Sequence, residues 1–514
     1  MDMTYLIRFF LKNKVNRYVF SFLSKKGKDG KSILEDIFSL YTSGNGHLPF
    51  SRKLRILPFY LFFEIGRVIF GQTRKDVEKE LSNRTFQKGI SLVMRSVAHY
   101  GLTYPQKFIA PPVVVWNFTN ICNLKCKHCY QSAGKRLPDE LSLSKRLDVI
   151  DQLAAEDVFS IAFSGGEPLM DKDIWPVIER AKKEAMYVSI ATNGTLITKD
   201  VAKRIANAGV DYVEISVDST HPEIHDEFRG VRGAWEKTIE GIKNVVEQDS
   251  VNVGLAPTIT KMNFNELEDL IKLAIELKVD KFFVFNFIPV GEGKNLIDLD
   301  LTPEMREKML STLYDYYVKK GIVTLTTCPQ YARVSMMKSK GELAPTSHYT
   351  MGKGEKTRLI AEFIGGCGVG RAYCAIQPDG IVTPCVYMPI KVGDLKKQSF
   401  KEIWTTSPIL KDLRNRDDLK EHCGVCEYRS ACGGCRARAY AYFGDYKAPD
   451  PGCINNKDAF LKLKKETAVT VESSIFRESK DINNSAQTFG STLLDRSIKK
   501  RSFPETGVKE ENKK

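Results

Sequence analysis

The stretch CNLKCKHC at residues 122–129 directly follows the apolar run VVVWNFT at residues 113–119. It places three cysteines, Cys122, Cys126 and Cys129, on one short loop behind a predicted strand. Structural zinc sites favour paired CxxC knuckles that supply four ligands to each ion. Three thiolates on a cubane iron–sulfur cluster instead leave one iron open to a ligand that is not protein. The spacing therefore predicts a catalytic iron–sulfur centre on this loop.

Outward from this loop, residues 111–290 alternate strand and helix with a period of about 25 residues, which is typical of a parallel sheet. Strands are predicted at 113–119, 158–163, 188–192, 212–217, 252–259 and 281–288, and helices between them, for example at 142–155, 173–185 and 264–277. Six such units form an incomplete α/β barrel of the TIM type, whose ligands bind at the carboxyl ends of the strands. SGGEP (164–168) follows the second strand, TNG (192–194) follows the third, and Ser216 ends the fourth. We therefore expect one site at one mouth of a partial (β/α)6 barrel.

The remaining cysteines indicate further metal sites. The chain has 12 cysteines, and none precedes residue 122. Eight of them fall near the C-terminus, as Cys367, Cys374, Cys385, Cys423, Cys426, Cys432, Cys435 and Cys453. In a cytosolic chain such clusters indicate metal binding rather than disulfides. Cys328 stands alone, and we expect it to be an inert buried thiol.

These motifs, together with HDEFRG at residues 225–230, resemble those of a radical S-adenosylmethionine (radical SAM) enzyme with a C-terminal SPASM domain, over about residues 111–460. The resemblance implies that the three cysteines of the 122–129 loop bind a 4Fe-4S cluster whose open iron takes S-adenosylmethionine. It further implies a cofactor-binding set of Gly165, Gly166, Glu167, Asn193, Ser216 and Arg229. Of these, the GGE residues would meet the methionyl amino group, Ser216 the ribose or carboxylate, and Arg229 the methionyl carboxylate.

By the same resemblance, the C-terminal cysteines hold two auxiliary 4Fe-4S clusters, which makes three clusters in all. The first auxiliary group is Cys367, Cys374, Cys385 and Cys435, and the second is Cys423, Cys426, Cys432 and Cys453. Eight thiolates for two cubane clusters leave no open iron, which suits electron transfer. Cys432 and Cys435 are separated by two residues where many members of the family have three, which puts the partition of ligands in doubt. The alternative is that the CGVC and CGGC sequences bind a zinc ion.

Charge and hydrophobicity set the N-terminal region apart. The net charge is +14, but residues 1–110 hold 19 Lys and Arg against 8 Asp and Glu, whereas residues 111–460 hold 46 against 47. The composition, 42% hydrophobic and 27% charged, excludes a disordered chain, a fibrous repeat and a small disulfide scaffold. No window supplies the roughly 18–20 uncharged apolar residues that a membrane-spanning helix needs.

Two apolar segments, residues 5–23 and 56–71, lie within this basic region. The first has apolar residues at helical spacing, namely Leu11, Val15, Tyr18, Val19 and Phe22. The second is too short and, with Glu64 and Arg67, too charged to cross a bilayer. Basic amphipathic helices of this kind lie in the lipid headgroup layer of a membrane. We therefore predict that residues 1–75 contact the cytoplasmic face of a membrane peripherally. Packing of both segments onto the catalytic body is the alternative, and no nucleic acid is expected as a partner.

Five regions follow from these observations. They are a basic helical extension (1–110), a radical SAM core (111–325), a linker (326–360), a SPASM domain (361–460) and a flexible tail (461–514). No cleavable signal peptide is evident, so we expect a cytoplasmic protein. We also expect its clusters to receive electrons from a low-potential donor of the ferredoxin or flavodoxin type.

Three hypotheses of function remain open. The first is an oxidoreductase that cleaves S-adenosylmethionine to a 5′-deoxyadenosyl radical and modifies a peptide, protein or tetrapyrrole. The second is a membrane-associated enzyme that forms or alters C–C bonds on lipid chains. The third is a non-catalytic iron–sulfur electron carrier. Such a carrier would not need the GGE motif, because it would not bind S-adenosylmethionine. The resemblance also places Val386 where sulfatase-maturing relatives have an aspartate base, which disfavours their reaction. The substrate itself is not identified by the sequence.

Overall fold

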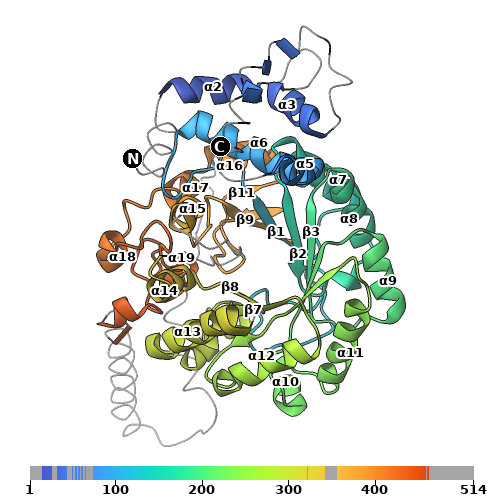
Figure 1. The fold of residues 1–514 in the computed structure, drawn as a ribbon. Helices are drawn as coiled ribbons and strands as arrows, with labels where there is room; N and C mark the ends of the chain where they lie inside the picture. Colours follow the sequence, from blue (N-terminus) through green and yellow to red (C-terminus); the bar gives the residue numbers. More distant parts are fainter. Residues whose placement is uncertain are drawn as a thin grey trace, which may run out of the picture.

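The computed structural model describes residues 14–25, 32–42, 73–320, 322–341 and 356–458, residues 460 and 461, and single positions between 49 and 67. Its centre is a curved sheet of 11 strands wrapped on its outer side by helices (Figure 1). The strands are β1 (Val113–Thr119), β2 (Ser160–Gly165), β3 (Tyr187–Thr192), β4 (Tyr212–Ile215), β5 (Asn252–Leu255), β6 (Thr258–Ile259), β7 (Lys281–Asn286), β8 (Val323–Thr326), β9 (Tyr373–Ile376), β10 (Ile381–Thr383) and β11 (Gly393–Asp394). The tail predicted at 461–514 lies outside the described residues except for residue 461.

The predicted α/β fold is confirmed. Strands β1 to β5 pair in parallel in sequence order, β5 pairs with β7, and β7 pairs with β8. The covering helices are α7 (Leu143–Ala155), α8 (Ile174–Lys183), α9 (Lys199–Asn207), α10 (Pro222–Arg229), α11 (Ala234–Val246), α12 (Leu267–Glu276) and α13 (Pro303–Lys320). Short 3-10 turns lie at η2 (Pro168–Met170), η3 (Phe264–Glu266), η4 (Gly291–Leu299) and η5 (Ile454–Asn456).

The bounds of β1 to β4 and β7 lie within two residues of those predicted, and the larger differences concern β5, β6 and β8. The fifth predicted strand, 252–259, divides into β5 and β6 around Pro257, which has no N–H to donate to a ladder. β8 is an additional parallel strand beyond the six predicted units. It spans only four residues, VTLT, and so short a run is a weak signal even though apolar and polar residues alternate in it.

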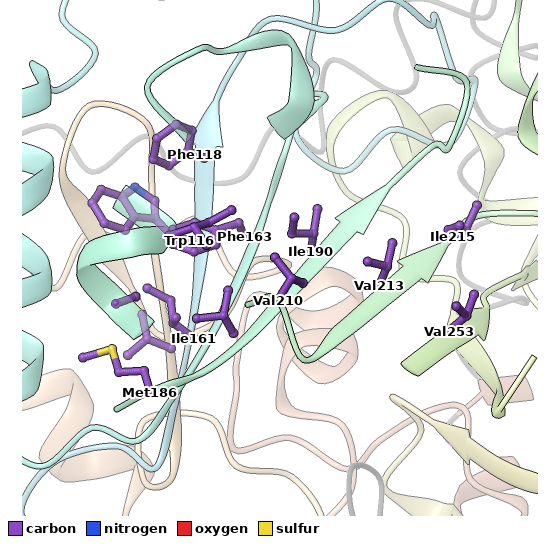
Figure 2. Close-up of a cluster of buried hydrophobic side chains, with 14 of the residues drawn as sticks. Trp116, Phe118, Ile161, Phe163, Met186, Ile190, Val210, Val213, Ile215 and Val253 are labelled. Carbon is purple, nitrogen blue, oxygen red and sulfur yellow. The ribbon is translucent and has the colours of Figure 1, made fainter. Parts of the chain in front are cut away.

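The core lies between the sheet and its helices. Half-buried and buried residues alternate in the first four residues of β1 and β2, along all of β3 and in the last three residues of β4, since successive side chains point to opposite faces of a strand. The buried set packs under the helices and includes Trp116, Phe163, Ile190 and Val213 (Figure 2). The half-buried set faces the concave side of the sheet. The fold therefore reserves its inner face for something other than core packing.

The C-terminal region extends the same sheet. β9 pairs in parallel with β1, with Cys374 opposite Val114, and β10 and β11 continue antiparallel beyond β9. The helices of this region are α14 (Gln330–Lys338), α15 (Lys356–Ile364), α16 (Phe400–Thr406), α17 (Pro408–Leu413), α18 (Glu421–Val425) and α19 (Arg436–Phe443). The described part of the interval 326–360 therefore includes one complete helix, α14. The five predicted domain boundaries stay predictions.

The N-terminal region forms helices α2 (Lys14–Ser24), α3 (Ile33–Thr42), α5 (Arg74–Ser82) and α6 (Arg84–Tyr100). They share an apolar cluster of their own, to which α2 contributes Phe20 and Leu23. Of the face predicted at helical spacing, Tyr18 is 78% exposed and Phe22 is 43% exposed, so that face is only partly covered. No helix in the described part of the chain is long and apolar enough to cross a membrane.

Helix α6 attaches this cluster to the barrel. Arg95 Nη1 lies 2.6 Å from Asp157 Oδ2, and Ser91 donates to the same carboxylate at 3.0 Å. Thr85 donates to the carbonyl of Ala185 at 2.8 Å, and Leu92 is buried in the main core. Helix α6 thus packs on the barrel, whereas α2, from the first apolar segment, packs on α6, where Arg17 Nε donates to the carbonyl of Ala98 at 3.3 Å. Packing of the segments 5–23 and 56–71 themselves onto the catalytic body stays a prediction.

Shortening a side chain of the outer-face core tests this architecture. Phe163→Ala should lower the free energy of unfolding by about 3–5 kcal/mol, because it removes transfer energy and leaves a cavity. Tyr18→Ala, at an exposed site, is the control and should leave stability within about 0.5 kcal/mol. Urea unfolding of each variant checks both values, and equal midpoints for the two variants would contradict this assignment of the core.

Candidate functional site

The cysteine loop lies at the carboxyl end of β1, half-buried at all three cysteines. Backbone N–H groups point at two of the sulfurs: Leu124 N donates to Cys122 Sγ at 3.5 Å, and Ala133 N donates to Cys129 Sγ at 3.4 Å. Such donors stabilise thiolates. The loop is therefore shaped to hold negative charge on sulfur.

The GGE motif packs directly against this loop. Gly165 has a φ of +120°, and a Cβ built on Gly166 would lie 2.1 Å from the carbonyl oxygen of Ile121. Gly166 N donates to Thr119 O at 2.8 Å, and Glu167 N donates to Ile121 O at 2.7 Å. Only glycine allows this close approach of two backbones. The predicted pair Gly165 and Gly166 thus fixes the base of the cysteine loop.

Glu167 joins the second and third strand ends. Its buried carboxylate accepts from the Thr192 hydroxyl at 2.8 Å, from Asn193 N at 2.9 Å and from Leu169 N at 3.1 Å. Burial raises the pKa of Glu167 to about 7, although these hydrogen bonds oppose the shift. A cation placed beside this carboxylate would favour its ionised form.

Asn193 connects the TNG turn to the cysteine loop. Its Nδ2 donates to Asn123 Oδ1 at 2.8 Å, and Asn123 Nδ2 donates to the Thr195 hydroxyl at 2.8 Å. Asn123 lies directly after Cys122. The structure therefore brings the SGGEP, TNG and cysteine motifs together, as their positions at strand ends predict.

Arg229 reaches the same place from α10. Its Nη1 donates to Cys126 Sγ at 3.8 Å, and its Nε donates to Asp218 Oδ2 at 2.7 Å. Burial alone would lower the pKa of Arg229, but the charges of Asp218 and Cys126 outweigh it and raise the pKa. A guanidinium at this position can hold an anion beside the cysteine loop.

Ser216 lies one residue beyond β4 and is half-buried, and its backbone N donates to Thr192 O at 3.1 Å. Its predicted contact with a cofactor stays a prediction. His128 stacks on Phe228 with ring centroids 4.0 Å apart, and burial lowers its pKa to about 3. A neutral imidazole packed on a ring makes His128 part of the wall of the site.

The thiols themselves fit a bound cluster. Burial raises the pKa of Cys122 to about 12, so this thiol ionises near neutral pH only when a cation offsets the thiolate. No group of three Cys, His, Asp or Glu residues in the described ranges is arranged to hold a single metal ion. The donor chemistry of the loop fits an iron–sulfur cluster, which spreads its ligands around several atoms.

The C-terminal region brings cysteines together from distant parts of the sequence. Cys367 N donates to Cys432 O at 3.1 Å, although 65 residues separate them in the sequence. Cys426 is half-buried, whereas the other seven are buried. Asp450 bridges the two predicted groups: its N–H donates to Cys423 Sγ at 3.5 Å and its carboxylate accepts from Cys435 N at 2.6 Å. The predicted partition into two clusters stays a prediction.

Buried arginines surround these cysteines. Arg371 donates to the carbonyls of Gln106 and Ile364, its Nε is buried without a hydrogen bond, and burial lowers its pKa to about 9. No carboxylate among the described residues forms an ion pair with it. A buried guanidinium without an anion is costly, so an anionic cluster held by the nearby thiolates fits the charge of this region.

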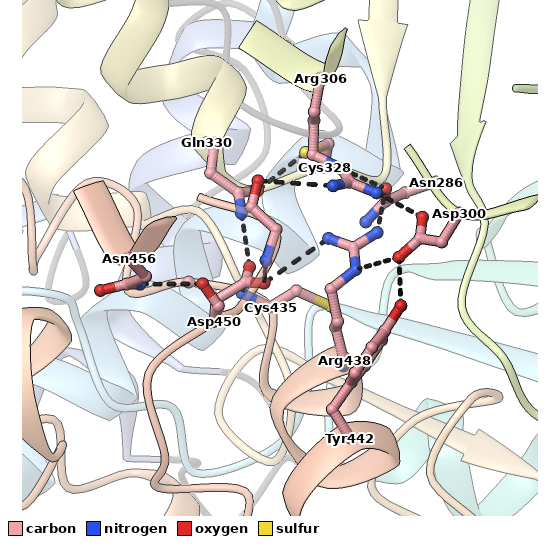
Figure 3. Close-up of polar contacts among 12 residues, drawn as sticks. Asn286, Asp300, Arg306, Cys328, Gln330, Cys435, Arg438, Tyr442, Asp450 and Asn456 are labelled. Carbon is pink, nitrogen blue, oxygen red and sulfur yellow. Dashed lines mark hydrogen bonds and ion pairs between the residues drawn. The ribbon is translucent and has the colours of Figure 1, made fainter. Parts of the chain in front are cut away.

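A further polar network joins the C-terminal region to the barrel (Figure 3). Arg438 is fully buried, and its guanidinium lies 3.5 Å from Asp300 Oδ2 and 3.6 Å from Asp450 Oδ1. It also donates to Asn286, the last residue of β7. Cys328 donates to Gln330 Oε1 at 2.7 Å within the same network, and burial raises its pKa to about 11. Cys328 is thus a buried thiol, as expected.

The inner face of the sheet lies between the cysteine loop and the C-terminal cysteines. Tyr130 follows Cys129, and its hydroxyl lies 3.0 Å from Ser164 Oγ. Its ring meets the ring of Tyr387 edge-on, with centroids 5.0 Å apart. Glu214, on β4, faces the same side, and burial raises its pKa to about 8. This surface combines aromatic rings with groups that are neutral hydrogen-bond donors near pH 7.

Several of these residues were not identified from the sequence. Asp218, Asn123 and Tyr130 have partners 11 to 72 residues away in the chain. Asp218 lies two residues after Ser216, and this position beyond a strand end was the available signal. The partners themselves come from other loops, which sequence spacing does not specify.

Comparison with known families agrees with this geometry. A family model described as the radical SAM superfamily matches residues 116–300. A second model, SPASM, described as an iron-sulfur cluster-binding domain, matches residues 367–427. The two matches cover the cysteine loop and the first five of the C-terminal cysteines.

Curated relatives resemble the chain over both regions. An AdoMet-dependent heme synthase of Methanosarcina barkeri is 34% identical over 347 residues, which cover 67% of this chain and 97% of that protein. The mycofactocin maturase MftC of Mycolicibacterium smegmatis is 30% identical over 353 residues, which cover 67% of this chain and 83% of that protein. Among solved structures, Streptococcus suis SuiB bound to S-adenosylmethionine has a TM-score of 0.59 at 17% identity, with 82% of this chain and 93% of that chain covered. At that identity the likeness concerns the fold.

The Asp218–Arg229 pair is a direct test of the site. Asp218→Asn should weaken the binding of S-adenosylmethionine to the reconstituted protein about tenfold, because a charge-assisted hydrogen bond that orients a buried guanidinium contributes about 1.5–3 kcal/mol. Equilibrium dialysis under nitrogen measures the affinity. Glu227→Gln, which breaks an exposed ion pair with Lys127, is the control and should leave the affinity unchanged. An unchanged affinity in Asp218→Asn would remove Arg229 from the anion site.

Proposed function

Because this chain belongs to the radical SAM superfamily and carries a SPASM iron–sulfur domain, we propose that it abstracts a hydrogen atom from an unactivated carbon of a peptide, protein or tetrapyrrole and so oxidises that substrate. One observation carries the proposal. The cysteine, SGGEP, TNG and HDEFRG motifs, scattered over about 110 residues, meet at one end of the barrel through the contacts of Glu167, Asn193 and Arg229.

A 4Fe-4S cluster and S-adenosylmethionine bound at this site would supply the chemistry of reductive cleavage, which yields a 5′-deoxyadenosyl radical. Cys122, Cys126 and Cys129 hold the cluster in our proposal. Glu167 offsets positive charge on the methionyl amino group, and Arg229 pairs with the methionyl carboxylate. The chain contributes placement, charge and the exclusion of water.

The substrate carbon lies on the inner face in this proposal, between the cysteine loop and Cys385. Tyr130 and Tyr387 supply an aromatic wall there, and Glu214 supplies a carboxyl that is largely protonated at neutral pH. Small side chains on the same face, Ser189 and Ala191, leave space over β3. A large substrate with hydrogen-bond acceptors suits such a surface.

The relatives favour this class of substrate. One is named for heme synthesis and one for the maturation of mycofactocin, and SuiB has also been solved with its precursor peptide. The eight C-terminal cysteines would hold two fully ligated clusters, which supply electron transfer. A low-potential donor of the ferredoxin or flavodoxin type fits the reducing cytoplasm that we propose for this protein.

The N-terminal region supports a second candidate, in which the enzyme works at a membrane surface on lipid chains. Leu54, Leu57 and Leu61 follow helical spacing and are 63%, 47% and 52% exposed. The excess of basic residues in this region favours anionic headgroups.

Anaerobic turnover tests the main proposal. Reconstituted protein reduced with dithionite should convert S-adenosylmethionine to 5′-deoxyadenosine, and Cys126→Ala should abolish this product. Cys328→Ala is the matched control, because Cys328 is a buried cysteine outside the predicted ligand sets, and it should retain the activity. A Cys126→Ala protein that still forms 5′-deoxyadenosine would refute the site.

The substrate class is tested in the same assay with fractions of cells grown in deuterated medium. Deuterium should enter 5′-deoxyadenosine with the peptide or tetrapyrrole fraction. Label that enters only with the lipid fraction would contradict the main proposal and favour the membrane candidate.

Membrane contact is tested independently by sedimentation with vesicles. The full chain should sediment with phosphatidylglycerol vesicles, and the triple variant Leu54→Glu, Leu57→Glu, Leu61→Glu should bind at least tenfold more weakly, because it removes exposed apolar area and adds negative charge. Phe86→Glu, at a 41% exposed site on α6, is the control. Equal sedimentation of the wild type with phosphatidylcholine and phosphatidylglycerol would argue against electrostatic membrane contact.

A further inference from the structure

Arg416 lies between the two predicted groups of C-terminal cysteines. It follows α17, is 6% exposed, and donates from Nη2 to the carbonyl of Cys367 and from Nη1 to the carbonyl of Cys432 at 3.5 Å. Cys367 belongs to the first predicted group and Cys432 to the second. One guanidinium thus touches the backbone of a predicted ligand from each auxiliary cluster.

The chain around Arg416 is shaped for this side chain. Gly433, directly after Cys432, has a φ of +71°, and a Cβ built there would lie 1.1 Å from Arg416 Nη1. The CGGC sequence therefore bends around the guanidinium with no side chain between them. Any other residue at position 433 would displace Arg416.

The charge of Arg416 has no protein anion to meet it. Its acceptors are carbonyl oxygens, and among the described residues no carboxylate forms an ion pair with it. A second buried guanidinium is close enough for its charge to act on Arg416: Arg436 donates to Cys423 Sγ at 3.7 Å and to the carbonyl of Ala448 at 2.8 Å. Two like charges buried near each other are costly unless an anion offsets both.

A 4Fe-4S cluster with four thiolates is such an anion, and its reduction adds one more negative charge. Cluster potentials respond to nearby charge and to hydrogen bonds at the sulfurs. A cation that faces two clusters stabilises the reduced form of both.

We propose that Arg416 is a positioning residue shared by the two auxiliary clusters, whose buried charge raises the reduction potential of both. This inference rests on the proposed function for the presence of the two clusters. Arg414, two residues away, provides a contrast. It is equally buried, bonds to the carbonyls of Gly370 and Trp404, and has Cys374 of the first group as its cysteine neighbour.

The test is an EPR-monitored redox titration in a Cys122→Ala, Cys126→Ala, Cys129→Ala background, which removes the signal of the other cluster. Cys374→Ala and Cys453→Ala, one from each group, assign the two remaining signals. Arg416→Met should lower the reduced-to-oxidised ratio of both clusters about tenfold at a fixed potential, equal to about 59 mV for a one-electron couple. Arg416→Lys, which keeps the charge, should lie closer to the parent background than Arg416→Met does. Arg414→Met should leave the second signal unchanged.

Each outcome decides the inference. Arg416→Met protein that retains all its iron and both midpoints overturns it, and so does a shift confined to one cluster. If Arg416→Met loses iron, Arg416→Lys decides: retention of both clusters supports the role of charge, and loss of iron in both variants overturns it in favour of a purely structural role. A background protein that holds fewer than two auxiliary clusters before Arg416 is changed would instead refute the cluster count of the proposed function.

Discussion

The contact between the cysteine loop and the ends of its neighbouring strands is the constraint on which the site depends. The loop is held by backbone hydrogen bonds from Gly166 and Glu167, at distances that leave no room for a Cβ on Gly166. Because the contact is between backbones, it fixes the start of the cysteine loop without depending on side-chain rotamers. Glu167 and Asn193 then join the next strand end to this loop. The backbone of the cysteine loop is thus anchored to the rigid part of the barrel.

The same first strand also positions the C-terminal cysteines. β9 pairs with the opposite edge of β1, so that Cys374 lies opposite Val114 in the sheet. The radical SAM core and the SPASM region therefore share a single hydrogen-bonded framework. The Arg438 network adds a second connection, from Asp450 beside Cys423 and Cys435 to Asn286 at the end of β7. This shared sheet holds the two cysteine regions in a fixed arrangement relative to each other.

Electrostatics distinguishes the two cysteine regions. Beside the cysteine loop, the positive charge of Arg229 is balanced by the carboxylate of Asp218. Some of the guanidinium N–H groups of Arg229 remain available to an anion. Around the C-terminal cysteines, Arg371 and Arg416 meet only carbonyls among the described residues. Since an unpaired buried cation is unstable, the second region fits the permanently bound anions that we propose for it, and the first fits a ligand that exchanges.

The sequence by itself determined the parallel strand–helix units of the barrel and the cysteine spacing. These are local patterns. Hydrophobic periodicity predicts strands such as 113–119 and helices such as 142–155, and the motifs directly follow the predicted strand ends. Only the tertiary structure decided the partners of Arg229 and Arg416, the pairing of β9 with β1, and the partial burial of α2. The physical reason is that these contacts join residues far apart in the chain, where burial and charge depend on what packs alongside. The cysteines predicted to bind each cluster and the residues predicted to bind S-adenosylmethionine stay predictions.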